Sequence, residues 1–547
     1  MEKILFIVPP HITFEHFIKP TYNARIIQKK GGDFGRVLTD IPLGVLSLSS
    51  YVKKHATVET KVVDFNVVLN KLENFNFPSF ADFFRDFLSS PEWQEYNPSL
   101  IGISALFAPS YDSMRDIAQC CREVFPGAMI VAGGGVPTNM YGEIFRESTC
   151  FDALCFGEGE KPLLGLVQAK DKFRYLEENS SWITRKKAET GQSFQFDFIE
   201  DLDEIPFFDY DILDIEEYEL NPTISAYLFI DKTKKSMPSM TSRGCVFHCC
   251  FCSVHTVHGR RIRYYSTSRI REDFIRLKDR YGIQKIIFQD DHFMADKKRV
   301  YEIINILREL QLTAFFPNSL ALFALDREML AALKSVGVDQ LILAAESGSK
   351  RVLKEIMHKP INLAMIKPAV DICREIEIYT DVNILIGLPG ETKLDIEETR
   401  SFLKTISPNW FRINIATPLV GSEMFEVAVK NKHLRDDYKS ADFKKAVIET
   451  EDFSAKDIEE LSYFLNLELN FVENSDFRLG NYEMALKGFE NAIKAKSDHA
   501  LAFYYAAKCH EKLGDVARAN QYRNIAQAIV AENPFWRNYA NMFKISI

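Results

Sequence analysis

The chain has 547 residues, of which 46% are hydrophobic and 26% are charged, and its formal net charge at pH 7 is −9. This composition is ordinary for a globular protein of several domains and excludes a disordered tail protein or a collagen-like chain. No run of about 18 apolar residues is present and the N-terminus lacks a secretory cleavage pattern. We therefore expect a cytoplasmic protein without a membrane span, and the negative charge argues against a nucleic-acid partner.

Residues 1–165 alternate short β-branched runs with helical patterns. This alternation predicts an α/β fold, a Rossmann-like doubly wound sheet that binds ligands beyond the carboxyl ends of its strands. Strands are expected at 3–8, 58–65, 100–106 and 128–132, and the residues at or beyond their ends include Pro9, Asp64, Ser104 and the triplet Gly133, Gly134, Gly135. A glycine triplet after a strand is equally typical of a simple turn.

Two segments depart from this alternation. Six phenylalanines between residues 75 and 87 predict a helical insertion packed on the sheet, and the alternative is a flap over a ligand or partner. Residues 166–236 are mixed and polar, with many acidic side chains, and we interpret them as a connector between two domains.

A second alternating block occupies residues 237–425. Six strand-and-helix units in about 190 residues predict a partial (β/α)6 TIM-type barrel, because a complete eight-unit barrel needs about 250 residues. The six strands are expected at 239–242, 285–289, 313–317, 340–344, 381–386 and 411–416.

The remaining chain is expected to be all-α, with a helical linker at 426–465 and a repeat at 466–547. Leu479-Gly480-Asn481 recurs as Leu513-Gly514-Asp515 after 34 residues, and this period resembles that of tetratricopeptide repeats. Tyr482, Phe489 and Ala492 stand at the packing positions of that repeat. The second copy departs from the pattern at Val516 and Arg523, and a plain helical hairpin is the alternative.

Four of the ten cysteines crowd into the segment Cys245-Val-Phe-His-Cys249-Cys-Phe-Cys252. In a reducing compartment such a group is typical of metal binding. Three thiolates spaced C-x3-C-x2-C can hold three irons of a [4Fe–4S] cluster and leave the fourth iron open to S-adenosylmethionine (SAM). A zinc site is the alternative, but it needs a fourth ligand such as Cys250, and the usual paired C-x2-C spacing is absent.

This loop resembles the signature of the radical SAM superfamily, and it follows the first expected barrel strand. The resemblance implies that Cys245, Cys249 and Cys252 ligate iron and that Cys250 does not. It also implies SAM contacts at later strand ends, including a match of Gly387-Leu-Pro-Gly-Glu-Thr392 to the family's adenine-side motif. The SAM-binding residues implied are Phe251, Asp290, Asp291, Glu346, Ser347, Gly387 and Glu391.

Simpler interpretations of these residues stay open. Asp291 or Asp296 would also serve as a helix cap, and Glu391 would also serve as a carboxylate at a helix start. Arg263 follows the cysteine loop, where a basic residue is usual in the cobalamin-binding branch of the family, but it would equally fit a solvated face.

The first domain then resembles the cobalamin-binding domain that precedes such barrels, through Pro42-Leu43-Gly44, Asp64-Phe-Asn66 and Gly157-Glu-Gly-Glu160. The usual Asp-x-His-x-x-Gly motif is absent, so the resemblance implies base-off cobalamin without the histidine ligand of that motif. The implied cobalamin contacts are Pro9, Leu43, Gly44, Asp64, Ser104, Gly133, Gly134, Gly135, Gly157 and Glu158.

The resemblance implies a cobalamin-dependent methyltransferase that acts on an unactivated carbon or phosphorus centre through a 5′-deoxyadenosyl radical. One alternative is a cobalamin-dependent radical oxidase, cyclase or rearrangement enzyme without net methylation. Another is an interaction protein whose tail binds partners and whose iron–sulfur cluster is structural or carries electrons. An enzyme of this kind needs an electron donor of the flavodoxin or ferredoxin type, and the tail would recruit a peptide, protein or carrier-bound substrate.

Overall fold

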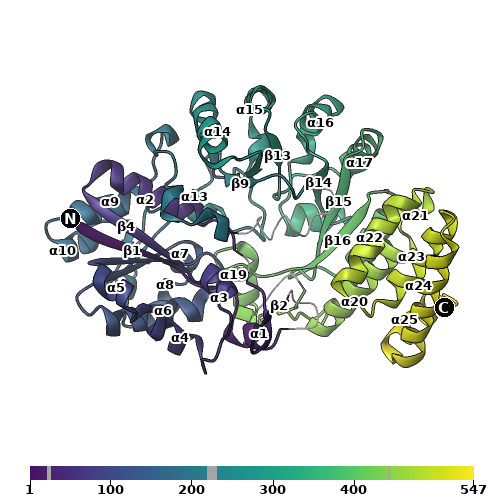
Figure 1. Ribbon diagram of the computed structural model, residues 1–547, viewed down its shortest axis with the longest axis horizontal. Helices are drawn as coiled ribbons and strands as arrows, with labels where there is room; N and C mark the ends of the chain where they lie inside the picture. The colour runs from purple at the N-terminus through teal and green to yellow at the C-terminus, as the bar shows by residue number, and fades with distance from the viewer. Residues whose placement is uncertain (21–25, 38, 219–230, 441–443) are drawn as a thin grey trace.

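The computed structural model describes residues 1–20, 26–37, 39–218, 231–440 and 444–547. Figure 1 shows a sheet flanked by helices at the N-terminal end, a curved row of strands backed by helices in the middle, and a helical tail. The part of the expected connector at 219–230 and the part of the expected linker at 441–443 lie outside the described residues. No described helix is both long and apolar enough to span a bilayer.

The first sheet has six strands in the order β4-β1-β5-β6-β7-β8. Its first five strands are parallel, and β8 joins antiparallel. The order of the parallel strands is that of a doubly wound sheet, in which the ligand crevice opens between β1 and β5. The strands are β1 (Glu2–Val8), β4 (Val58–Asp64), β5 (Leu100–Ser104), β6 (Met129–Gly133), β7 (Ala153–Cys155) and β8 (Trp182–Ile183).

Helices cover both faces of this sheet. Side chains of β1 alternate between two cores, with Leu5 and Ile7 on one face and Ile4 and Phe6 on the other. Helices α2 (Leu43–His55), α9 (Glu160–Gln168) and α10 (Lys172–Glu178) cover one face, and the other carries α1 (Phe14–Ile18), α3 (Phe65–Lys71), α4 (Phe80–Leu88), α6 (Tyr111–Val124), α7 (Gly135–Asn139) and α8 (Tyr141–Glu147).

The phenylalanine-rich segment forms part of this core. Phe80, Phe83 and Phe84 of α4 are buried, and the ring of Phe84 lies 4.5 Å from that of Phe65. The segment is therefore the expected helical insertion rather than a flap. Next to it lie α5 (Pro91–Tyr96) and the hairpin of β2 (Ile26–Lys29) and β3 (Gly32–Gly35).

The first sheet continues beyond residue 165, where we expected the connector to begin. Trp182 of β8 pairs with Cys155 of β7 and is buried in the same core as α9. A polar stretch thus contributes an edge strand because one aromatic residue anchors it. The chain then passes through α11 (Arg185–Glu189) and the short turns η2 (Leu202–Glu204), η3 (Tyr210–Ile212) and η4 (Ile215–Glu217).

The middle part is the expected partial barrel of six parallel strands, in two groups ordered β13-β12-β9 and β14-β15-β16. A parallel bridge between Leu320 and Leu343 joins the groups. The strands are β9 (Ser236–Ser239), β12 (Lys285–Phe288), β13 (Thr313–Phe315), β14 (Gln340–Glu346), β15 (Tyr379–Ile386) and β16 (Trp410–Ile415).

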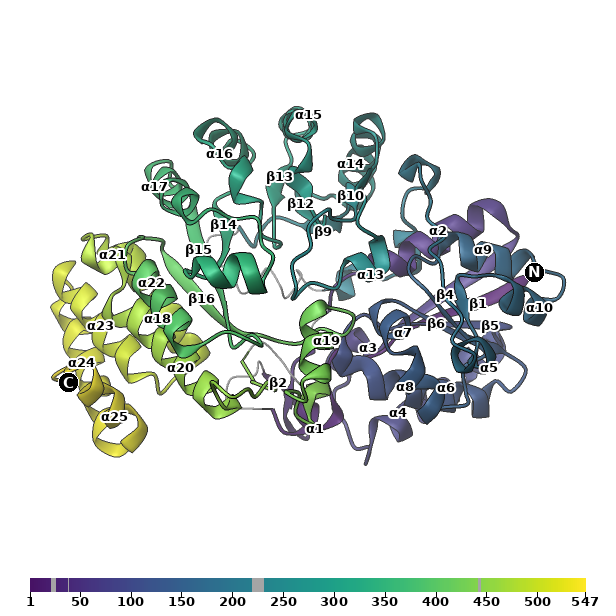
Figure 2. The ribbon, with the colours of Figure 1, turned by 180° about the vertical axis from the view of Figure 1, so that it is seen from behind.

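Helices line the outer side of the barrel, as Figure 2 shows for α14 to α17. A short hairpin of β10 (Ser242–Arg243) and β11 (Arg263–Tyr264) precedes the first of them. The connection between β10 and β11 contains α13 (His255–His258). The helices that follow are α14 (Thr267–Tyr281), α15 (Lys297–Glu309), α16 (Arg327–Lys334), α17 (Ile366–Glu375), α18 (Lys393–Leu403) and α19 (Glu423–Lys430).

The tail is helical throughout its repeat. Phe489 and Ala485 are buried, and aromatic contacts join successive helices, such as Phe489 with Tyr505 at 5.9 Å. Assignment to the tetratricopeptide family stays a prediction. The helices are α20 (Ala455–Leu467), a π-helical turn η10 (Glu468–Val472), α21 (Ser475–Arg478), α22 (Tyr482–Ala495), α23 (Ala500–Lys512), α24 (Val516–Glu532) and α25 (Pro534–Met542).

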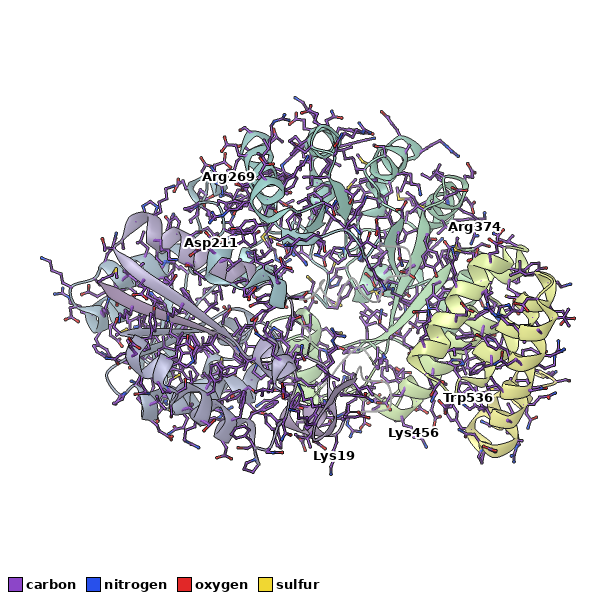
Figure 3. The ribbon with its side chains drawn as sticks, in the orientation of Figure 1. Lys19, Asp211, Arg269, Arg374, Lys456 and Trp536 are labelled. Atoms are coloured by element: carbon purple, nitrogen blue, oxygen red, sulfur yellow. The ribbon has the colours of Figure 1, made fainter. Side chains whose placement is uncertain are left out.

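The tail is joined to the barrel through η10 and α21. The Asn470 side chain accepts from the Phe411 amide and donates to the Phe411 carbonyl, each at 2.8 Å, along the edge of β16. Arg374 of α17, labelled in Figure 3 where the barrel meets the tail, pairs with Asp476 at 2.5 Å. The expected boundary at 466 therefore falls just before residues that complete the barrel edge.

Candidate functional site at the strand ends of barrel and sheet

The three predicted cluster ligands lie on one loop between β10 and α13. Cys245, Cys249 and Cys252 are half-buried, whereas Cys250 is buried. The backbone of Cys250 holds the loop to the barrel, because its amide donates to the Met357 carbonyl at 3.0 Å and its carbonyl accepts from the Met424 amide at 2.8 Å. The loop therefore presents three thiols and keeps the fourth in the core.

Electrostatics distinguishes the same three thiols. Burial raises the pKa of all four, to about 11 for Cys249 and about 12 for Cys250. The Lys359 ammonium acts in the opposite direction on Cys245, Cys249 and Cys252 but not on Cys250. A cation beside three thiols favours their thiolate form, which is the form that ligates iron.

The chemistry of the donor set fits an iron–sulfur cluster. Among the residues that the structure describes, no three His, Cys, Asp or Glu side chains form a group that could hold one metal ion. Three thiolates that each bind a different iron of a [4Fe–4S] cluster need not converge on one point. The donor set of three thiols on a short loop, with Cys250 withdrawn, matches the cluster that the spacing predicts.

Lys359 was not predicted as a site residue, yet it links two residues that were. Its ammonium pairs with Glu346 at 2.8 Å and lies 5.5 Å from the centre of the Phe251 ring. Burial alone would lower the pKa of Lys359, but the Glu346 carboxylate raises it above its ordinary value. Glu346 adopts a left-handed φ of 62° at a bulge in β14, so its side chain occupies this position against a backbone preference.

The two predicted aspartates after β12 do different things. Asp290 is buried and accepts from the Thr241 amide, at 3.1 Å, and from the hydroxyls of Thr241 and Ser242. Asp291 accepts from the amide of Gly244 at 2.8 Å, one residue before the first cluster cysteine. Asp290 thus braces the barrel's first strand, and Asp291 lies beside the cysteine loop. The helix-cap interpretation is confirmed for Asp296, which is the N-cap residue of α15.

The later strand ends are also held by internal hydrogen bonds. Ser347 is buried with its hydroxyl 3.0 Å from that of Thr399. Glu391 accepts from the Gly387 amide at 2.6 Å, and Gly387 has a φ of 87°. Glu391 Oε1 is buried without a hydrogen-bond partner among the described residues, and burial raises the pKa of this carboxyl to about 8. These residues shape the turn, and the cap of α18 is Thr392.

In the first sheet, the predicted residues at the ends of β1 and β4 form one network. The Pro9 carbonyl accepts from the Asn66 side chain at 3.2 Å. Asp64 accepts from the same side chain at 2.8 Å and from the Tyr218 hydroxyl at 3.0 Å. Burial raises the pKa of Asp64 to about 6. Protein groups thus occupy both carboxylate oxygens of Asp64. Asp64 stands at the border of the crevice and is not openly exposed in it.

The glycine loops bring backbone segments together. Gly134 has a φ of 103°, and a Cβ there would lie 2.6 Å from the Ala105 carbonyl oxygen. The neighbouring Gly133 pairs in register with Ser104. At Gly157, with a φ of 80°, a Cβ would lie 2.5 Å from the Phe196 ring. These glycines allow close packing of the protein on itself, so the simple turn interpretation accounts for much of their presence.

Other residues near the crevice are open. Gly44, next to the half-buried Leu43 at the start of α2, has nothing within 4 Å of its Cβ position. Leu106 and Phe107 lie just beyond Ala105 at the end of β5 and are 55% and 49% exposed. The His11 ring lies 5.3 Å from that of Phe107. The crevice between β1 and β5 therefore presents apolar side chains that the sequence analysis did not single out.

Glu158 lies in a buried ionic contact between the sheet and the barrel. It is buried and accepts two hydrogen bonds from Arg263, at 2.5 and 2.9 Å, and its carboxylate lies 2.7 Å from His258 Nδ1. Arg243 pairs with it at 3.3 Å and with Glu160 at 2.8 Å. Burial alone would raise the pKa of Glu158, but these cations hold it well below its usual range. Glu158 joins the sheet to the barrel, and Arg263 does not face solvent.

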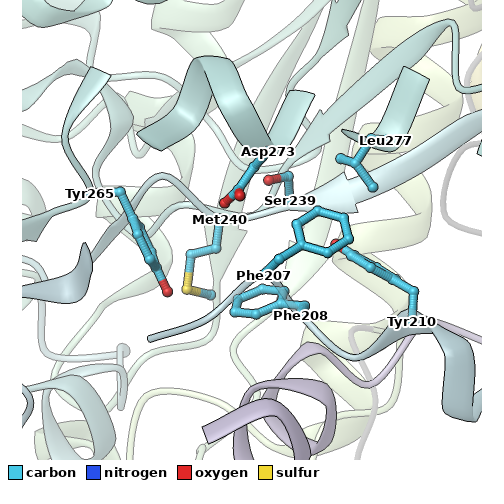
Figure 4. Close-up of a pocket in the computed structure, with 8 residues that line it drawn as sticks. All are labelled: Phe207, Phe208, Tyr210, Ser239, Met240, Tyr265, Asp273 and Leu277. Carbon is cyan, nitrogen blue, oxygen red and sulfur yellow. The ribbon is translucent and has the colours of Figure 1, made fainter. Parts of the chain in front are cut away.

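The cavity in Figure 4 lies apart from these residues. Aromatic side chains of the connector, Phe207, Phe208 and Tyr210, face Met240 and Tyr265 of the barrel there. It contains none of the predicted site residues. It belongs to the packing of the connector on the barrel.

Lys359, which the sequence analysis missed, carried no recognisable sequence signal. Lys359 is one of many lysines, and only the fold brings it to the cysteine loop. Leu106 and Phe107, which were also missed, could have been found because they stand at the end of an expected strand, at the crevice edge.

Two family models match this chain. The radical SAM superfamily matches residues 239–403, and the B12 binding domain matches residues 40–167. The cysteine loop and the strand ends after β12 to β15 lie in the first match, and the loops after β4 to β7 lie in the second. These matches confirm the expected cofactor set of an iron–sulfur cluster, SAM and cobalamin.

Curated relatives and solved structures agree with this division. The chain is 28% identical to the uncharacterized methyltransferase PH0819 of Pyrococcus horikoshii, over 72% of this chain and 80% of that one. It is 26% identical to the cytidylyl-2-hydroxyethylphosphonate methyltransferase of Streptomyces wedmorensis, over 62% and 68%. The cobalamin-dependent SAM radical enzyme OxsB, with aquacobalamin and SAM bound, matches 99% of this chain and 80% of its own with a TM-score of 0.62 and 14% identity. The expected fold class is thereby confirmed.

Proposed function

Because this chain belongs to the radical SAM enzymes that bind cobalamin, we propose that it methylates an unactivated carbon or phosphorus centre of its substrate. When bound, the cluster supplies the electron that cleaves SAM, and cobalamin supplies the methyl group. Such an enzyme needs a reductant, and we propose a donor of the flavodoxin or ferredoxin type.

The residues proposed for each cofactor follow from the site. Cys245, Cys249 and Cys252 hold the cluster. Phe251, in the cysteine loop, and Asp291 and Glu346, close to it, are the proposed SAM contacts. Asp290, Ser347, Gly387 and Glu391 shape the strand ends behind them. Leu43, Gly44, Ser104 and the glycine turn 133–135 would hold cobalamin, and Pro9, Asp64 and Gly157 would frame it.

One observation carries the proposal that both cofactors serve one reaction. The loop after β7, at the carboxyl edge of the sheet, is ion-paired through Glu158 and Glu160 to Arg243, which directly precedes the cysteine loop. Ligands of a doubly wound sheet and of a TIM-type barrel both bind at the carboxyl ends of strands. This joint, formed by Glu158, Glu160 and Arg243, therefore supports an arrangement in which the methyl donor and the radical source meet at one substrate.

The test begins with cobalamin bound per chain after anaerobic reconstitution and desalting, for which we expect a ratio near one. The loaded protein is then reduced and mixed with SAM that carries a trideuterated methyl group. Mass spectrometry of the extracted cofactor should show the label on cobalamin. A protein that retains no cobalamin, or never labels it, is not a methyltransferase of this class.

The radical alternative without net methylation uses the same residues, so product mass separates the two. With a found substrate, methylation adds a mass of about 14 Da (one CH2 unit), whereas oxidation or cyclisation removes hydrogens. A labelled cofactor together with an unlabelled, dehydrogenated product would favour the alternative.

For the tail we propose recruitment of a peptide, protein or carrier-bound substrate. Leu479 and Leu513 stand at equivalent turns of the repeat and are 54% and 42% exposed. The double variant L479D/L513D disturbs no core, so SAM cleavage should be unchanged while turnover of the native substrate falls. Equal turnover would contradict recruitment through these turns.

A further inference from the structure

The cysteine loop is fixed on both sides by one acidic loop of the other domain. Arg243 precedes the loop, His258 ends the helix that follows it, and Arg263 lies on β11. All three contact Glu158, at 3.3, 2.7 and 2.5 Å. Glu158 stands directly after β7, at the carboxyl edge of the first sheet. A single carboxylate thus links both ends of the cysteine loop to the sheet.

The charges of this joint are balanced and removed from water. The side chains of Arg243, Arg263 and Glu158 are at most 4% exposed. Glu160 faces Arg243 at 2.8 Å and accepts from the Ser47 hydroxyl on α2 at 2.5 Å. Two carboxylates therefore neutralise two guanidinium groups, and the hydroxyl of a third element fixes the second carboxylate.

This arrangement specifies geometry more than it adds stability. Buried ion pairs are often replaceable by apolar side chains without loss of stability, because desolvation offsets their attraction. A guanidinium that gives two hydrogen bonds to one carboxylate, however, permits only one relative orientation of the groups. Arg263 does so at 2.5 and 2.9 Å, and it also lies 4.2 Å from the centre of the Phe198 ring. A second bond crosses the same boundary, from Asn139 to the Thr256 hydroxyl at 2.9 Å.

We propose that Glu158 is a positioning residue, which fixes the cysteine loop against the cobalamin-binding sheet so that both cofactors reach the same substrate atom. The inference rests on the proposed function for its purpose, but the contact itself involves only residues of this chain. It also replaces the expected role of Glu158 as a cobalamin contact.

The first experiment uses the full chain without cofactors. In E158Q the carboxylate charge is lost at nearly unchanged volume, and we expect amide hydrogen exchange in residues 244–262 to accelerate at least roughly tenfold. The matched control is D152N, because Asp152 pairs with Arg122 at 2.9 Å within the first domain. Exchange at 244–262 that is unchanged in E158Q would overturn the proposal.

Should E158Q fail to fold, R263K carries the same test, since lysine keeps the charge but cannot donate the paired hydrogen bonds. We expect faster exchange there as well, and wild-type exchange in R263K would overturn the proposal.

The second experiment uses the loaded enzyme. The spin–spin interaction between cob(II)alamin and the reduced cluster, measured by pulsed EPR, should give one narrow distance distribution in the wild type and in D152N. In E158Q we expect a broader one, and an unchanged distribution would overturn the proposal. If the wild type binds no cobalamin, the proposed function fails, while the exchange result still decides whether Glu158 fixes the loop.

Discussion

The barrel mouth and the sheet edge occupy equivalent topological positions but present opposite chemistry. At the barrel mouth, the half-buried Lys359 pairs with Glu346 beside three thiols, and Asp291 lies close to the loop. At the sheet edge, the charged residues Asp64 and Glu158 are occupied by the protein, and exposed apolar side chains follow β5.

This difference separates two kinds of ligand. Ionic groups that are held in place but not fully paired suit a small ligand with an ammonium and a carboxylate, such as SAM. The sheet edge has exposed apolar side chains and Gly44, whose Cβ position has no atom within 4 Å. Such an open surface suits a wide macrocycle, which binds mainly through its contact area. The same α/β architecture therefore serves two cofactors through the residues placed after its strands.

The largest effect should come from the cluster ligands and should be confined to the barrel. In C245A, iron should fall from about four per chain to near zero, because one thiolate of three is lost. Cobalamin retention should be unchanged. C250A is the control and should keep its iron, since Cys250 is buried whereas the three proposed ligands are half-buried. Loss of cobalamin together with iron in C245A would show that the two regions do not bind independently.

The sheet edge should respond to a charge placed on its apolar surface. In L106D, cobalamin retained after desalting should fall at least roughly tenfold, because a carboxylate would be buried against the macrocycle. Iron content should not change. L479D, on an exposed tail leucine, is the control for an added surface charge. Wild-type cobalamin binding by L106D would remove this residue from the proposed crevice.

The positive charge of Lys359 tests whether the barrel mouth is ionic. Removal of this cation in K359M should lower the reduction potential of the cluster by on the order of 50 mV, because positive charge nearby stabilises the reduced form. An EPR-monitored redox titration measures the shift. K354M, at an exposed lysine of the preceding turn, should leave the potential unchanged. Equal shifts in both variants would mean that the effect is not local.

Glu391 should give the smallest effect. Burial raises its pKa to about 8, whereas an unfolded glutamate titrates near 4.3. Between these values the folded protein holds a proton that the unfolded chain releases, so this group makes stability fall as pH rises. E391Q removes the loss of stability that the buried carboxyl causes as pH rises. The melting temperature of E391Q should therefore exceed that of the wild type by about 2 °C at pH 8 and be the same at pH 4. E398Q, an exposed neighbour, should show no such pH dependence.

The sequence was sufficient for the parts of the fold that repeat a strong local pattern. The strands of both sheets lie close to their expected positions because buried parallel strands are continuous apolar runs. The strand β8 was missed because Trp182 stands alone in a polar stretch, and its place depends on tertiary packing. The contact of Asn470 with β16 could not be predicted for a similar reason, since the two residues that form it are 59 positions apart in the sequence.

The candidate site also contains residues that the sequence marks and residues that only the fold brings together. Cys245, Cys249 and Cys252 are adjacent in sequence, so their spacing alone indicates their chemistry. Lys359 comes from a loop more than a hundred residues later, and nothing in its neighbourhood marks it. Glu158 was found by its motif, but its partners Arg243 and Arg263 were not, because a motif identifies a residue without showing what it contacts.

The contact of Asn470 with Phe411 has a consequence for how the protein escapes aggregation. A partial barrel, unlike a closed one, leaves a last strand whose backbone groups would pair with a second chain. By bonding both the amide and the carbonyl of Phe411, the Asn470 side chain imitates a neighbouring strand at one point and blocks that edge. The tail thus protects the open barrel from edge-to-edge assembly, whatever else it binds.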